Sequence, residues 1–219
     1  MENYGVDPHV GIDVLVVAIA LSIIAYFGGK KYRRGEEVEP SGVLDFHSFL
    51  EVVIGGIFNF TKSFLHDKAG KFFFLFGSLT LFILFNNLIG VIPGFHPPTN
   101  QFNTTIVLGL FVFVTTHIVG LQVHGAAYIK HFTGPVWWLA WLIFPIELIS
   151  HLVRPLSLAL RLFGNMTGDH KVVGVFFLLM PLFIPLPMIG MGIFVAFVQT
   201  FVFLLLSLVY ISGALEHAH

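Results

Sequence analysis

Residues 145–170 read PIELISHLVRPLSLALRLFGNMTGDH, and this stretch decides the fold of the chain. Its polar side chains recur at steps of three and four residues, which places most of them along one face of a helix. They are Glu147, Ser150, His151, Arg154, Ser157, Arg161, Asn165 and Asp169. The positions between them are mostly apolar, so the pattern predicts an amphipathic helix with one polar, hydrated side and one apolar side.

The same apolar character continues to residue 180 and is interrupted only by Lys171. We therefore predict one long helix over residues 143–180. A helix of about 35 residues measures roughly 52 Å, whereas the hydrocarbon core of a bilayer is about 30 Å thick. We expect this helix to lie strongly tilted or to be bent.

Arg161 is the residue in this helix that most needs an explanation. Its neighbours Leu160, Leu162 and Phe163 are apolar, and no acidic residue lies one turn away. A guanidinium stays protonated in proteins and costs at least about 2.5–3.5 kcal/mol at the centre of a membrane. The isolation of Arg161 favours a functional role for its charge. It makes an arginine that reaches the membrane surface, or one held in a salt bridge, the less favoured explanation.

The composition predicts an all-α polytopic protein embedded in a lipid bilayer. The 219 residues are 56% hydrophobic and 11% charged, against about 25% charged residues in soluble domains. The chain has no cysteine, which excludes thiolate nucleophiles and thiolate metal sites, and its net charge of −1 gives no reason to expect nucleic acid. The first residues lack a basic signal-peptide region, so we expect the first apolar segment to stay in the protein.

Apolar runs predict five membrane-crossing helices, over residues 10–27, 72–92, 105–124, 143–180 and 187–213. A basic cluster, Lys30, Lys31, Arg33 and Arg34, follows the first run. The positive-inside tendency puts this cluster in the cytoplasm, residues 1–9 outside and the C-terminus inside. The last two helices, which contain Arg161 and Gln199, form a hairpin.

Residues 45–68 show a different pattern, because apolar residues at helical spacing lie opposite polar ones such as Asp45, Glu51 and Lys62. We predict an amphipathic helix in the cytoplasmic membrane interface. The alternative is a helix that packs on a soluble partner.

The sequence raises two other possible functions, a haem protein and an ion-coupled transporter. His117, His124 and His131 lie seven residues apart, but a bis-histidine haem needs a matching histidine on another helix, and none appears at suitable depth. The zinc protease motif His-Glu-x-x-His is absent, so we expect no cofactor and no metal. An ion-coupled secondary transporter remains the alternative function, although we find no inverted repeats or broken helices.

Residues 154–166, RPLSLALRLFGNM, closely resemble the signature of subunit a of the F-type ATP synthase. The resemblance extends to NLIGVIPG at 87–94, to Glu147 and to Gln199, and covers about residues 40–216. It implies a non-catalytic stator subunit of the bacterial inner membrane. Its partners would be a rotating ring of c subunits, whose carboxylates carry protons, and b-type peripheral stalk subunits.

The resemblance also implies roles for single residues. Arg161 would promote deprotonation of each ring carboxylate and block a proton leak, with Gln199 beside it. Asn165 and Ser157 match polar positions of the channel region, and Glu147 matches an acid of the cytoplasmic half-channel.

The outer half-channel departs from the family pattern. His170 occupies a position where relatives hold an ionisable group, but the usual partners of that group would fall at Gly192 and Gly90, which cannot titrate. We expect Asp169 and His170 to share this work, because histidine titrates near neutral pH.

Overall fold

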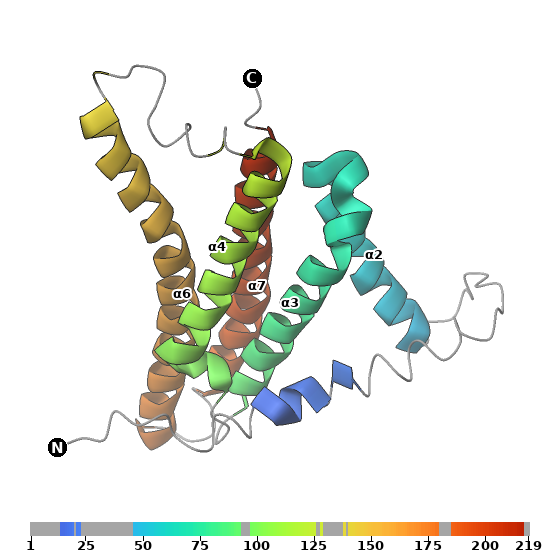
Figure 1. Cartoon of the computed structure of the whole chain (residues 1–219). Coiled ribbons are helices and arrows are strands. Elements are labelled where there is room, and N and C mark those ends of the chain that lie inside the picture. Colours follow the sequence, from blue (N-terminus) through green and yellow to red (C-terminus); the bar gives the residue numbers. More distant parts are fainter. Residues whose placement is uncertain are drawn as a thin grey trace.

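The computed structural model describes residues 14–19, 21–22, 46–92, 97–125, 128, 138, 140–179 and 185–216. Within these ranges the chain forms helices joined by turns and contains no strand (Figure 1), which confirms the all-α class. Most of the predicted first crossing at 10–27 lies outside the described residues. The part that is described, residues 14–19 and 21–22, is helical. The remaining elements are α2 (Phe46–Leu65), η1 (His66–Lys68), α3 (Ala69–Gly90), η2 (Pro98–Asn100), α4 (Phe102–His124), α6 (Ala140–Leu179) and α7 (Pro185–Glu216).

Four stretches of the described residues are long and apolar enough to cross a membrane: Val52–Gly90, Phe102–His124, Trp141–Leu178 and Leu186–Leu215. The first of these joins α2 to α3, but the two helices are separated by η1, where His66 has a φ of 47°. The chain turns there, so that α2 and α3 form a V in Figure 1. Five crossings with a separate surface helix therefore remain a prediction.

α2 packs back on the bundle because its inner face is apolar. Phe60 stacks against Phe201 of α7 with ring centroids 4.7 Å apart, and the Ser212 hydroxyl donates to the carbonyl oxygen of Phe64 at 3.4 Å. The buried cluster that joins α2, α3, α4 and α7 consists of Leu65, Ala69, Phe72, Phe76, Val119, Leu204, Leu208 and Ile211.

α6 has 40 residues, which corresponds to about 60 Å. Figure 1 shows that it is curved. Pro145 and Pro155 lie inside it, and a proline within a helix removes one backbone hydrogen bond and favours a bend. α7 begins where α6 ends, so the two helices run antiparallel (Figure 1).

α4 lies directly against the backbone of α6. A Cβ atom at Gly109 would stand 2.6 Å from the carbonyl oxygen of Pro155, closer than carbon and oxygen can approach. Glycine at this position therefore allows the close contact. The adjacent core joins four helices through Leu79, Ile83, Val112, Leu158, Leu162 and Phe203.

Candidate functional site

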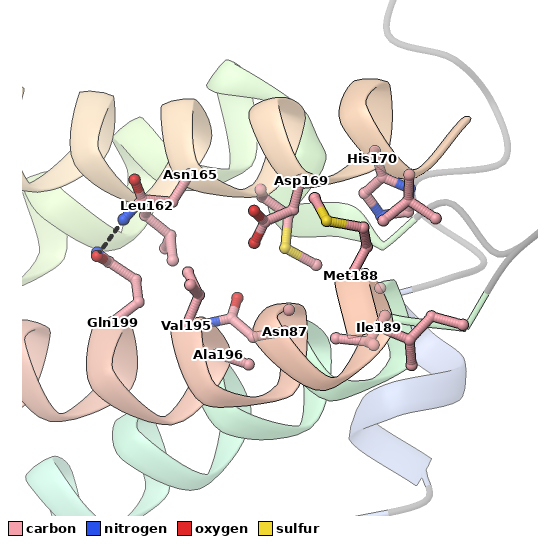
Figure 2. Close-up of a pocket in the computed structure, with 15 residues that line it drawn as sticks. Asn87, Leu162, Asn165, Asp169, His170, Met188, Ile189, Val195, Ala196 and Gln199 are labelled. Atoms are coloured by element: carbon pink, nitrogen blue, oxygen red, sulfur yellow. Dashed lines mark hydrogen bonds between the residues drawn. The ribbon is translucent and has the colours of Figure 1, made fainter. Parts of the chain in front are cut away.

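A polar pocket lies between α3, α6 and α7, at the end of the bundle where α3 and α6 end and α7 begins (Figure 2). Its polar lining consists of Asn87, Asn165, Asp169, His170 and Gln199. The pocket has a volume of about 40 Å³. One water molecule needs about 10–15 Å³ of such volume and two to four polar partners, so the pocket suits a short chain of waters.

The inner end of the pocket is closed by a hydrogen bond between the two long helices. The Asn165 amide nitrogen donates to the Gln199 amide oxygen at 2.6 Å (Figure 2), and Gln199 is only 5% exposed. Asn87 of α3 joins the same region by donating to the Thr200 hydroxyl at 3.3 Å. These amide contacts join α3, α6 and α7 at the same depth in the bundle.

Arg161 lies one turn before Asn165 on α6, and its side chain is exposed rather than inside the pocket. The surrounding outward face is apolar and includes Leu156 and Leu160, which are 41% and 49% exposed. Among the described residues no carboxylate forms an ion pair with Arg161.

Asp169 and His170 occupy the other end of the pocket. In Figure 2 the Asp169 carboxylate points into the space between α6 and α7, and His170 lies near Met188 and Ile189. Both residues come from α6, so they enter the pocket from the same helix as Asn165.

The structure explains one of the two glycines that depart from the family pattern. A Cβ atom at Gly90 would overlap the side chains of Met166 and Pro97 and would lie 3.2 Å from His170 Nε2. Gly192 differs, because a Cβ atom there would make only ordinary contacts of 3.6 Å with Val91. A side chain at position 90 would thus require Met166 and Pro97 to shift, whereas a Cβ atom at position 192 fits without any shift.

Two of the predicted site residues lie elsewhere. Glu147 is near the opposite end of α6, where its Oε1 lies 3.4 Å from His151 Nδ1. Ser157 is half-buried between Glu147 and Arg161 and does not line the pocket. The pocket therefore unites Asn165, Asp169, His170 and Gln199, and leaves the other three predicted residues outside it.

Asn87 lines the pocket but was not among the predicted site residues, although it begins the NLIGVIPG motif. The statement that His117 lacks a matching histidine on another helix was wrong, since His151 of α6 faces it at a ring distance of 5.4 Å. The cavity beside the pair is only about 10 Å³, too small for a haem. No group of three residues able to hold a metal ion occurs in the described part of the chain.

The fold and the site together define a membrane protein of several spanning helices with a titratable pocket between its two longest ones. Residues 12–212 match the family described as ATP synthase A chain. The chain is 48% identical over 206 residues to ATP synthase subunit a of Geobacter sulfurreducens, which covers 94% of this chain and 86% of that protein. It is 54% identical over 172 residues to ATP synthase subunit a of Geotalea daltonii, covering 78% and 75% of the two chains. The chain belongs to the ATP synthase A chain family.

Proposed function

We propose that this chain is the non-catalytic, proton-translocating stator subunit of an F-type ATP synthase in the bacterial inner membrane. It provides two offset aqueous half-channels to a ring of c subunits and is held by b-type stalk subunits, with its N-terminus outside and its C-terminus in the cytoplasm. The observation that carries this proposal is the exposure of Arg161 on an apolar face, one turn from a polar pocket.

Arg161 acts on the carboxylates of the ring. A protonated, neutral carboxyl group can move through lipid, and the nearby guanidinium favours its ionised form when it arrives. The proton is then released into one half-channel. Because the guanidinium cannot lose its own proton, it also prevents protons from passing directly between the half-channels. Each charge that crosses against 100 mV stores about 2.3 kcal/mol, so a direct leak would dissipate the driving force.

The polar pocket serves as the outer half-channel. Asp169 and His170 supply titratable groups at its mouth, and the Asn165–Gln199 hydrogen bond lies at its inner end, one turn from Arg161. Ser157 and Glu147 belong to the half-channel on the other side of Arg161. The apolar faces of α6 and α7 around Arg161 are the surface that the ring covers.

The direct test is replacement of Arg161 by alanine in the assembled complex. We expect ATP-driven proton pumping into inverted membrane vesicles to fall to background, because ring carboxylates are no longer induced to release protons. Lys171→Ala is the matched control, since it removes another exposed cation from α6 outside the pocket. Normal pumping by the Arg161 variant, with normal assembly, would refute the proposal.

A further inference from the structure

A second polar cluster lies on the side of Arg161 opposite the pocket, between α4, α6 and α7. His117 and His151 face each other there with ring centroids 5.4 Å apart and ring planes at 78°. They line a cavity of about 10 Å³ together with Arg154 and Tyr210. His151 is buried and His117 is half-buried, so water reaches neither ring freely.

Both imidazoles are held by the backbone in the same way. His117 Nδ1 lies 2.9 Å from the carbonyl oxygen of Phe113, and His151 Nδ1 lies 3.1 Å from that of Glu147. Each distance fits an Nδ1–H group that donates to the carbonyl one turn earlier. In the neutral rings Nε2 is then the nitrogen that can accept a proton.

The groups around the pair limit how much charge it can hold. From α6 the pair meets Glu147 and the permanent cation Arg154, whose guanidinium lies 5.4 Å from the Tyr210 ring of α7. The Tyr128 ring lies 5.9 Å from His117. Burial raises the pKa of Tyr128, and the Arg154 charge only partly opposes this, so its hydroxyl stays neutral.

Two imidazolium ions beside Arg154 would repel one another strongly, because the site contains little water. A single proton on His151 is different, since the Glu147 carboxylate lies 3.4 Å away. The cluster is therefore built to hold one proton at a time.

We propose that His117, His151 and Glu147 form a proton-relay site that connects the inner half-channel with bulk water. This inference rests on the proposed function. When His151 carries two protons, its Nδ1–H bond breaks and an O–H bond forms on Glu147 Oε1, while the ring keeps the electron pair on Nδ1 and the proton on Nε2. Loss of the Nε2 proton and uptake of a proton on Nδ1 then restore the tautomer that donates to the Glu147 carbonyl oxygen. The Glu147 side chain is 29% exposed against 9% for His151, so Glu147 exchanges the proton with water. Uptake runs through the same steps in reverse.

Replacing each histidine by asparagine removes its ability to bind a proton but keeps its hydrogen bond to the backbone. The asparagine amide nitrogen can replace Nδ1–H as the donor to the carbonyl one turn earlier, as Asn86 does by donating to Phe82 at 2.7 Å. It cannot accept a proton. The control is His124→Asn, because His124 lies two turns further along α4, contacts the Ala214 carbonyl oxygen at 3.0 Å and does not line the cavity.

The experiment measures ATP-driven proton uptake by inverted vesicles at external pH 6 to 8, normalised to ATP hydrolysis. The protonated fraction of an ordinary imidazole falls more than about tenfold over this range. We expect His117→Asn and His151→Asn each to slow uptake severalfold and to flatten its pH profile. The double variant should be no worse than either single one, because the two rings act as one site. His124→Asn should match the unmodified protein.

An unchanged profile in both single variants, or an equal change in His124→Asn, would overturn the relay. If a histidine variant does not assemble, Glu147→Gln provides the second test, and a wild-type pH profile in that variant would also overturn it. Failure of the proposed function can be distinguished from failure of the relay alone. If the proposed function is wrong, the Arg161→Ala variant pumps protons normally, whatever the histidine variants do.

Discussion

At the scale of single residues, Gly90 determines where the pocket holds its titratable groups. Met166 and Pro97 occupy the volume that a side chain at position 90 would need, and His170 lies close to it. A carboxylate on α3 at this point would require Met166 and Pro97 to move, and the ionisable side chains of the pocket, Asp169 and His170, both come from α6. A proton entering the pocket would meet both groups on one helix.

His170→Ala tests this arrangement. We expect slower proton entry and a weaker pH dependence near neutrality, since the imidazole is the pocket group with an ordinary pKa closest to 7. The measurement is ATP synthesis driven by an imposed proton gradient, with the outer pH varied between 6 and 8. Lys171→Ala, one residue further on and outside the pocket lining, serves as the control. An unchanged pH profile in His170→Ala would remove this residue from the path.

The partners of single residues could be predicted only in part. The motif around Arg161 indicated which residues to expect at the site, and Gln199 was expected near Arg161. The structure instead pairs Gln199 with Asn165, one turn along α6. Residue spacing could not determine this register, because it depends on the curvature of α6 and on the contacts of Thr200 with Asn87.

At the scale of elements, the contact between α4 and α6 determines where the curved helix lies. Gly109 lets the two backbones approach at Pro155, and the His117–His151 pair forms at the same interface. Long apolar runs were enough to predict the all-α class. The turn at His66 and the return of α2 onto α7 were not predictable, since they depend on contacts between distant segments such as Phe60 with Phe201.

Gly109→Ala should destabilise the protein by about 1–3 kcal/mol, because the new methyl group would overlap the Pro155 carbonyl and push the helices apart. Thermal unfolding in detergent, followed by circular dichroism, measures this loss. The control is Gly77→Ala in α3, another buried glycine, where the nearest atom to the new methyl group is 3.7 Å away. Equal stability of the two variants would show that the close approach does not matter.

At the scale of the whole molecule, the most unusual surface is the apolar outer face of α6 and α7. On α6 it includes Leu156 and Leu160, which flank the exposed charge of Arg161. A lipid environment would satisfy the apolar side chains but not the guanidinium. A protein ring that brings one carboxylate after another to this face would satisfy both.

Disulfide cross-linking in the assembled complex tests whether the ring of c subunits covers the face around Arg161, since the chain has no cysteine of its own. Gly164→Cys places a thiol on the exposed face next to Arg161, at a position with no neighbouring atom within 4 Å. Ser78→Cys places one at an exposed position of α3 and serves as the control. With a second cysteine beside the ring carboxylate, we expect a cross-link from position 164 and none from position 78. No cross-link from position 164 in a complex that assembles would contradict this expectation.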